Sequence, residues 1–172
     1  MAAIFTSEGK AAENLAADVY GLTLIGDVNL QYVDVDAVDE NGRTISIKDQ
    51  MKTSKTYGTI TVEYELGTLG NERMDGNFLV NETDEYMWLV SHKGERGFMF
   101  MLSDEFKKFV LAQKEEWPVR GLTQWTIQEN VRRNRKYPRA WSWAVPVDVL
   151  IQQCWCEFDP LPDDYFRKYY RT

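Results

Sequence analysis

The sequence predicts an α/β (α+β) fold in which a mixed central β-sheet is flanked by helices. Two local patterns point to it: apolar residues recur at helical spacing over residues 7–20, and apolar and polar residues alternate over residues 59–66. The chain has 172 residues, of which 44% are hydrophobic and 27% charged. A chain of this size has room for one domain with a sizeable core, and its composition excludes disordered and low-complexity classes.

The first predicted element is a helix over residues 7–20. Ser7 is a suitable N-cap, and Gly21 is suited to the position where the helix ends. The apolar stripe of this helix consists of Ala11, Ala12, Leu15, Ala16, Val19 and Tyr20.

Strands are predicted next, at residues 22–25 and 30–38. Residues 39–42 then supply the chemistry of a tight turn, and residues 44–48 form a returning strand. Acids are unusual on a strand face, and the strand at 30–38 carries two on the same face, Asp34 and Asp36.

Two registers are open for this hairpin. A two-residue turn on residues 41–42 would place Asp36 opposite Ile47. A three-residue loop with a bulge at its glycine pairs Asp39 with Arg43 instead. We favour the second register, because only it brings the acids and the lysine onto one face, with Asp36 opposite Ser46 and Asp34 opposite Lys48.

The remaining elements are a half-buried strand at 59–66, a glycine-rich loop at 67–76, strands at 86–91 and 97–102, a helix that begins near Ser103 and a short helix at 147–154. After Pro118 the pattern weakens, and Pro160 and Pro162 are expected to end regular structure. We therefore expect a single domain over residues 1–172, with a core at 1–116 and an aromatic and basic C-terminal extension at 117–172.

The charge of the chain is unevenly distributed. The net charge is −7, yet residues 120–139 hold six basic residues and one acid, which leaves −12 for the rest. Such a segment can attract phosphates or can be a solvated helix face, and the candidates for nucleic-acid contact are Arg132, Arg133, Arg135 and Lys136. The aromatic residues interleaved with it can stack on bases, although core packing is favoured: Trp117, Trp125, Tyr137, Trp141 and Trp143.

Several classes of protein are disfavoured by what the sequence lacks. The N-terminus does not have the pattern of a signal peptide, and no apolar run is long enough to span a membrane, so we expect an intracellular protein without membrane contact. The only histidine, His92, falls in turn sequence, which disfavours a Ser-His-acid triad. No phosphate-binding glycine loop is present. Cys154 and Cys156 are too few for a zinc site and are expected to pack as thiols.

The acids and the lysine of the predicted hairpin are the candidates for chemistry. An isolated acid–lysine pair across a hairpin is most often a surface ion pair worth under ~1 kcal/mol. Here Lys48 follows Ile45 and Ile47, so its ammonium is tethered to buried structure near the acids. Converging carboxylates can hold a divalent cation, and the lysine can orient an attacking water or balance developing phosphate charge.

Three segments together resemble the PD-(D/E)XK nuclease superfamily, in particular its phage nucleases and Holliday-junction resolvase-like proteins. They are residues 9–16 as the helix with a glutamate, 33–36 as the aspartate strand and 46–48 as the Glu/Asp-x-Lys element. The resemblance covers the first two-thirds of the chain and implies a restriction-endonuclease-like αβββαβ core. It also implies a hydrolase that uses Mg²⁺ or Mn²⁺ to cleave phosphodiester bonds in DNA, with branched and single-stranded DNA among the candidate substrates.

The resemblance also assigns roles. Asp34 would be the principal metal ligand with Asp36 as its alternative, Lys48 would position the water, and Glu13 would assist from the helix. The sequence departs from the family at Ser46, where a carboxylate is usual, and Glu63 is a candidate replacement, as is the adjacent Asp49.

Two questions stay open at this stage. Helical spacing favours Glu8 as the inward acid of the helix, whereas the resemblance favours Glu13. Glu63 and Glu65 are also consistent with the solvent face of an antiparallel strand. The alternative function is a catalytically degenerate member of the same fold that binds nucleic acid or a protein partner, and a homodimer is not excluded.

Overall fold

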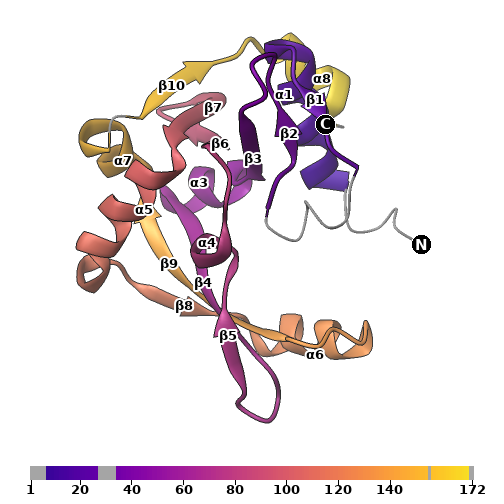
Figure 1. Cartoon of the computed structure of the whole chain (residues 1–172), viewed down its shortest axis with the longest axis vertical. Helices are drawn as coiled ribbons and strands as arrows, with labels where there is room; N and C mark the ends of the chain where they lie inside the picture. The colour runs from indigo at the N-terminus through magenta and orange to yellow at the C-terminus, as the bar shows by residue number, and fades with distance from the viewer. Residues whose placement is uncertain (1–6, 27–33, 155, 171–172) are drawn as a thin grey trace.

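The computed structural model describes residues 7–26, 34–154 and 156–170, and it contains two β-sheets with helices around them (Figure 1). The first sheet has the strand order β1-β2-β3-β6-β7-β10. Its strands are β1 (Thr23–Leu24), β2 (Ala37–Val38), β3 (Thr44–Asp49), β6 (Glu85–His92), β7 (Glu95–Leu102) and β10 (Glu157–Pro160). β3 pairs antiparallel with β2 and parallel with β6, so the sheet is mixed, as predicted.

The second sheet is antiparallel and has the order β5-β4-β9-β8. Its strands are β4 (Thr59–Gly67), β5 (Arg73–Asp75), β8 (Val119–Gly121) and β9 (Arg139–Pro146). The helices are α1 (Ser7–Tyr20), α3 (Met51–Tyr57), α4 (Asn77–Val80), α5 (Ser103–Ala112), α6 (Gln124–Arg132), α7 (Val147–Gln153) and α8 (Asp163–Tyr169). The predicted α/β (α+β) class is therefore confirmed.

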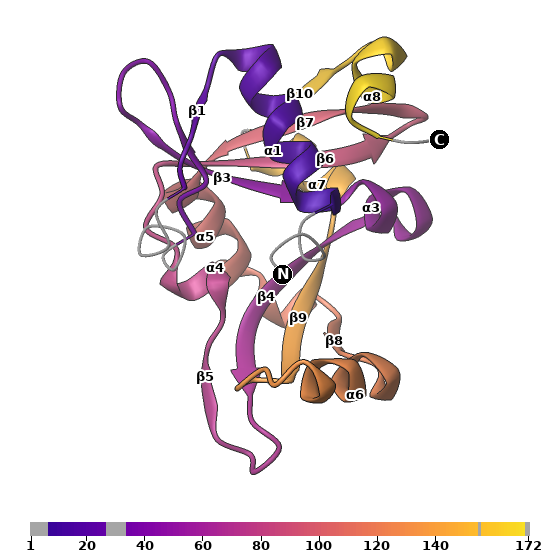
Figure 2. The same cartoon turned by 90° about the vertical axis from the view of Figure 1, so that its right-hand side faces the viewer.

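Both faces of the first sheet are buried, each under a separate hydrophobic cluster. One face packs against α1 and α8, and its cluster includes Leu15, Ile47, Leu89 and Phe166. The other face packs against α5, α7 and the second sheet, and its cluster includes Val62, Trp88, Phe106 and Leu150. Figure 2 shows α1 on one side of the first sheet and the second sheet projecting away from it.

The order of elements from the N-terminus is α1-β1-β2-β3-α3, and the next strand of the first sheet is β6. The elements β4, β5 and α4 lie between α3 and β6 in the sequence, and β4 and β5 belong to the second sheet. The helix that follows the lysine strand is thus α3, which the sequence did not predict, and not the helix at Ser103. Within the first sheet the order is α-β-β-β-α-β.

Residues 117–172, which the sequence indicated as an extension, supply strands to both sheets. β9 pairs with β4 from Thr59 opposite Pro146 to Gly67 opposite Arg139, and β10 pairs with β7. β10 ends at Pro160, but the expectation that regular structure stops at Pro160 and Pro162 was wrong, because α8 begins directly after Pro162 and buries Phe166. Pro160 is the last residue of an edge strand, where the missing N–H costs no ladder bond. The described part of this segment is integral to the fold.

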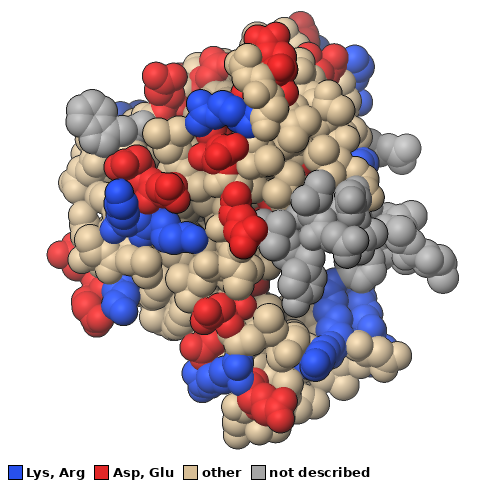
Figure 3. All heavy atoms as spheres, viewed as in Figure 1, with Lys and Arg blue, Asp and Glu red and all other residues tan. Residues whose placement is uncertain are grey.

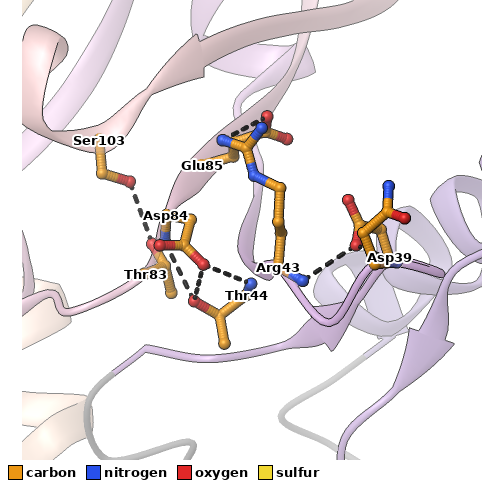
Figure 4. A network of polar contacts seen from close by, with 8 residues as sticks. Asp39, Arg43, Thr44, Thr83, Asp84, Glu85 and Ser103 are labelled. Carbon is orange, nitrogen blue, oxygen red and sulfur yellow. Dashed lines mark hydrogen bonds and ion pairs between the residues drawn. The ribbon is translucent and has the colours of Figure 1, made fainter.

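The parallel pair β3 and β6 is aligned at one end by a polar network (Figure 4). The Asp84 carboxylate accepts hydrogen bonds from the backbone N–H of Thr44 at 2.9 Å and from its hydroxyl at 3.1 Å. Arg43 forms an ion pair with Glu85 at 3.1 Å. These contacts fix the position of β3, and therefore of Lys48, against β6.

Gly97 marks a very close approach of two strands. A Cβ atom at this position would lie 2.1 Å from the carbonyl oxygen of Asp159 and 2.7 Å from Cα of Pro160. Only glycine allows β10 to approach β7 in this way. No helix among the described residues is both long and apolar enough to cross a membrane.

Candidate functional site

A pocket of about 190 Å³ lies where the first and second sheets meet. Its walls come from the turn before β2, from β3, from β4 and α4, and from β6. The described residues that line it are Asp34, Lys48, Gln50, Thr61, Val62, Glu63, Asn77, Phe78, Tyr86 and Trp88. Three of the predicted site residues, Asp34, Lys48 and Glu63, therefore converge on one cavity.

Asp34 and Lys48 form an ion pair across the hairpin. The register that we favoured is confirmed, because the backbone N–H of Asp39 donates to the carbonyl of Arg43 and Ala37 lies opposite Ile45. Gly42 has a φ of +79°, the left-handed conformation expected of a glycine in this loop. The side chain of Asp34 is largely buried, so this pair is better shielded from water than the surface ion pairs typical of hairpins.

The backbone of Asp34 differs from the prediction. Asp34 lies in a turn with a φ of +71°, and the strand that follows it contains only Ala37–Val38. The first part of the predicted strand falls within residues 27–33, outside the described residues. A left-handed aspartate is uncommon and costs on the order of 1 kcal/mol, which the contacts of its carboxylate offset.

A buried polar chain holds the other side of the Asp34 carboxylate. The side-chain amide of Asn81 donates to Oδ2 of Asp34 at 3.0 Å, and Oδ1 of Asn81 accepts from the backbone N–H and the hydroxyl of Thr83. The Thr83 hydroxyl in turn lies 3.2 Å from that of Ser103, and all four side chains belong to buried residues. Asn81 therefore fixes the orientation of Asp34.

Sequence analysis missed Asn81, Gln50 and Asn77 as parts of this site. Asn81-x-Thr83 directly before a strand is a sequence that favours an Asx turn, and this is the one signal that was present. Its contact with Asp34 spans 47 positions and has no local sequence signal. Gln50 accepts a hydrogen bond from the N–H of Thr61 at 2.9 Å and thereby ties the end of β3 to β4.

Glu63 lines the pocket next to an irregularity in β4. The register of β4 against β9 shifts between Glu63 and Glu65, as in a β-bulge, and a bulge re-aims the neighbouring side chains. Gly76 packs directly on this point: a Cβ atom there would lie 2.8 Å from the carbonyl oxygen of Glu63. Glu65 instead pairs with Arg73 on the hairpin to β5. The interpretation of both glutamates as a simple solvent face is wrong for Glu63.

Burial raises the pKa of Glu63 above its usual value, and the charge of Asp34 acts in the same direction. Two contacts oppose this rise in pKa, the charge of Lys48 and a hydrogen bond from the backbone N–H of Asn77 to the Glu63 carboxylate. Glu63 thus shares an electrostatic environment with both Asp34 and Lys48.

Asp36 occupies a different place. Its Oδ2 accepts a hydrogen bond of 2.7 Å from the backbone N–H of Ile47, and Asp36 is not among the residues that line the pocket. Burial raises the pKa of Asp36 to about 7; the Lys48 charge opposes this rise, whereas the charges of Asp34 and Glu13 add to it. The Asp36 side chain thus binds the backbone of β3 at Ile47, past the stretch of β3 that pairs with β2.

Glu13 is near enough to Asp36 for its charge to add to the rise in the pKa of Asp36. It also forms an ion pair with Lys10 at 3.7 Å. The side chain of Glu8 is outside the described residues. The structure therefore does not test whether Glu8 or Glu13 is the inward acid of the helix. Glu13 does not line the pocket of Asp34 and Lys48.

Neither Ser46 nor Asp49 lines this pocket. Ser46 is fully buried, and its hydroxyl has no hydrogen-bond partner among the described residues. The Asp49 carboxylate accepts from the N–H of Met51 and from the hydroxyl of Tyr170 at 2.9 Å. Asp49 is therefore committed to structural contacts, and Glu63 is the better candidate for the additional carboxylate.

The described residues of the pocket offer some, but not all, of the ligands that a hard divalent cation needs. Carboxylate oxygens are the ligands that Mg²⁺ prefers, and Asp34 and Glu63 both face the cavity. In the present side-chain arrangement, however, no three His, Cys, Asp or Glu side chains of the described residues are gathered closely enough to hold a metal ion. Asp34 and Glu63 fit by donor type and by location, whereas Asp36 has its carboxylate turned to the backbone of β3.

The cost of burying Asp36 can be measured. A carboxyl whose pKa is about 7 in the folded protein, against 3.8 for the free group, makes stability fall as the pH rises from about 4 to about 7. Asp36→Asn retains an oxygen acceptor for Ile47 and removes the charge. We expect this variant to be more stable than the parent by on the order of 1 kcal/mol at pH 8 and equal to it near pH 3.5. Chemical denaturation with EDTA present at both pH values checks this; an equal effect at both would exclude ionisation as the cause.

The basic segment lies beyond the far end of β4. Arg132, Arg133, Arg135 and Lys136 are exposed, and the chain then enters β9 at Arg139, opposite Gly67. Figure 3 shows a cluster of basic side chains at the lower right of this face, and both acidic and further basic side chains over the rest of it. Gly67 is four residues from Glu63 along β4, about 13 Å at the rise of a strand.

The aromatic residues near this segment divide between two roles. Trp117 and Trp143 are buried in the core, as expected for the packing interpretation. Trp125 on α6 is 68% exposed, and Trp141 lies under the guanidinium of Arg73 at 4.4 Å. Trp125 and Trp141 therefore remain candidates for contact with a ligand, as does the half-buried Tyr137, whose ring lies 5.5 Å from Nζ of Lys136.

No protein-family model matches this sequence, and a comparison with curated proteins finds no match. The geometry of the site and the motif therefore carry the argument on function.

Proposed function

We propose that the protein is a magnesium-dependent phosphodiesterase that acts on DNA. The observation that carries this proposal is the convergence of Asp34, Lys48 and Glu63 on one pocket. These residues come from the turn before β2, from β3 and from β4, and the first two lie in the hairpin that resembles the PD-(D/E)XK motif. The α-β-β-β-α-β order of the first sheet agrees with the same resemblance.

The chain's own residues suggest a division of labour. The Lys48 ammonium, held beside Asp34, is placed to donate hydrogen bonds to an attacking water or to a phosphoryl oxygen. Asn81 keeps Asp34 in its orientation, and Gln50, whose oxygen is bound to β4, presents its amide group near the same cavity. When bound by Asp34 and Glu63, Mg²⁺ would polarise the phosphoryl group as a Lewis acid.

A long polyanion suits the surface better than a small phosphate ester. Arg139 pairs with Gly67, about 13 Å along β4 from Glu63, and the exposed arginines at 132–135 lie shortly before Arg139 in the chain. An acidic protein of net charge −7 repels DNA in general, so a local basic segment determines where DNA approaches.

Replacing Arg132, Arg133 and Arg135 together by Ala should weaken DNA binding. The slope of log K against log salt should fall by about 0.9 for each duplex phosphate that the variant no longer neutralises. Arg132 and Arg133 also pair with Glu129, so helical content of the variant must be compared with that of the parent. Binding is measured by fluorescence anisotropy at several salt concentrations. An unchanged slope would assign this segment to another partner.

The proposal is tested by incubating the protein with duplex, single-stranded and branched DNA in Mg²⁺, Mn²⁺ or EDTA. Asp34→Asn, purified in parallel, controls for contaminating nuclease, because a contaminant would cleave equally in both preparations. We expect cleavage by the parent in Mg²⁺ or Mn²⁺ only, and a strong reduction in the variant. Cleavage that is equal in the two preparations, or absent on all three substrates, would exclude the enzymatic proposal.

A second candidate function is a catalytically degenerate protein of the same fold that binds nucleic acid or a protein partner. It is favoured by Ser46, which replaces the motif carboxylate and is buried away from the pocket. DNA binding without cleavage, abolished by the triple arginine variant, is the result expected of a degenerate nucleic-acid binder.

A further inference from the structure

A second and larger pocket, of about 430 Å³, lies at the opposite end of β6 from Tyr86. It is formed by the end of α3, the β6–β7 hairpin and the start of α7. The described residues that line it are Ser54, Lys55, Gly58, Ser91, His92, Lys93, Gly94, Arg96, Val147 and Asp148. It shares no lining residue with the pocket of Asp34 and Lys48.

The walls of this pocket are held together by backbone and hydroxyl contacts. The Ser54 hydroxyl accepts a hydrogen bond from the N–H of Ser91 at 2.8 Å and donates to the carbonyl of Met51, which fixes α3 against β6. The N–H of Val147 donates to the carbonyl of Gly58 at 2.9 Å and joins the start of α7 to the same rim. The cavity is therefore formed by elements of the core and not by a free loop.

The charge of the lining is positive in a protein that is negative overall. Lys55, Lys93 and Arg96 face one carboxylate, Asp148, which lies 3.3 Å from Nδ1 of His92. Arg96 is paired with Asp163 at 2.9 Å. Within the described part of the chain neither Lys55 nor Lys93 has an ion-pair partner. Two unpaired ammonium groups from different elements thus border one cavity.

We propose that this pocket binds a phosphorylated small molecule of about the size of a nucleoside monophosphate. A doubly charged phosphate can accept hydrogen bonds from both lysines at once. A carboxylate has one charge and two oxygens, so it matches two ammonium groups less well. The Ser91 hydroxyl and the His92 imidazole in the lining add polar groups for the rest of the ligand. The volume is within the range of small-molecule sites and leaves room for more than the phosphate itself. This site is independent of the proposed nuclease activity.

The test uses the full chain, without divalent metal, titrated with inorganic phosphate and with deoxyadenosine monophosphate. Binding is followed by nuclear magnetic resonance at the backbone amides of Gly58 and Gly94, which border this pocket and not the other one. We expect saturable shifts at both glycines, with the nucleotide binding more tightly than phosphate. Binding should weaken as ionic strength rises.

Matched variants locate the site. Lys93 has a φ of +50°, so Lys93→Gly removes the ammonium while keeping a residue that accepts this backbone conformation. Lys93→Gly and Lys55→Gln should each weaken binding about 10-fold or more. Lys52→Gln makes the same charge change on the same helix but outside this pocket, and should leave affinity within about twofold.

Three results would overturn the proposal: no saturable shift at either glycine, an equal loss of affinity in the Lys52 variant, or a nucleotide that binds no more tightly than phosphate. None of them bears on DNA cleavage. Conversely, a protein that fails to cleave DNA but shows the expected shifts would keep this site while losing the nuclease proposal.

Discussion

Lys48→Ala should lower DNA cleavage by at least ~10²-fold, provided that the protein is a nuclease. A positioned proton acceptor or a charge that stabilises the developing phosphate is commonly worth that factor. Lys48 is placed for either role, because its ammonium contacts Asp34 at the wall of the pocket that Glu63 also lines. Initial rates at saturating Mg²⁺ and DNA measure the effect.

The same substitution also affects folding. Asp34 is 7% exposed, so removing its lysine leaves a buried carboxylate with the Asn81 amide as its remaining described partner. Breaking one half of such a pair is often costly, whereas removing both charges is not. We therefore expect Lys48→Ala to lower stability and the double variant Lys48→Ala/Asp34→Asn to recover much of the loss.

The double variant reports on stability alone, because Asp34→Asn is itself expected to reduce cleavage strongly. The part of Lys48 in the reaction is therefore measured on Lys48→Ala under conditions in which circular dichroism shows that this variant is folded. Lys52→Ala is the matched control, since this lysine lies on the helix after β3 and lines neither the pocket of Asp34 and Lys48 nor the second pocket. Full cleavage by folded Lys48→Ala would remove Lys48 from the mechanism.

Gly97→Ala should destabilise the protein by about 3 kcal/mol, in the upper range for single substitutions. The added methyl group would meet the backbone of β10, which cannot rotate away as a side chain can. β7 must separate from β10, and the helix after β10, α8, carries the buried Phe166 of the cluster beneath α1. Both the strand ladder and that cluster are expected to weaken.

Urea denaturation measures the loss, and proteolysis of the region after residue 156 tests where it occurs. Gly121→Ala is the matched control, because its Cβ atom would have only ordinary contacts, the nearest at 3.8 Å. A Gly97 variant as stable as the Gly121 variant would mean that β10 shifts at no cost. The close approach of the two strands would then not restrict the residue at position 97.

The elements that the sequence predicted well are those whose signals are local. The stripe of α1 ends at Gly21, which has a φ of +66°, and the hairpin loop at 40–42 has the register that its glycine favours. The same local chemistry placed Lys48 beside Asp34, 14 positions away. Helix α5 and the pair β6–β7 were also predicted within a residue or two.

The parts that were missed depend on tertiary contacts. Helix α3, with the sequence Met-Lys-Thr-Ser-Lys-Thr-Tyr, buries only Ser54 and so has no apolar stripe to reveal it. The irregularity beside Glu63 arises where β4 pairs with β9, a strand distant in the sequence, and Gly76 packs against it. The short strands β5 and β8 carry no clear alternation and form as neighbours of β4 and β9.

The contacts around the site span long stretches of the sequence, and this has a consequence for folding kinetics. Asp34 and Lys48 can meet early, because a hairpin joins them, but the hydrogen bond from Asn81 to Asp34 must close a loop of 47 positions. The strand that carries Glu63 pairs with β9, far later in the chain, and α8 contacts α1 across 150 positions. Contacts of such long range slow folding and form late. A nascent or partly folded chain therefore contains the acid–lysine hairpin without its surrounding pocket, and acquires a complete site only when the last strands have docked.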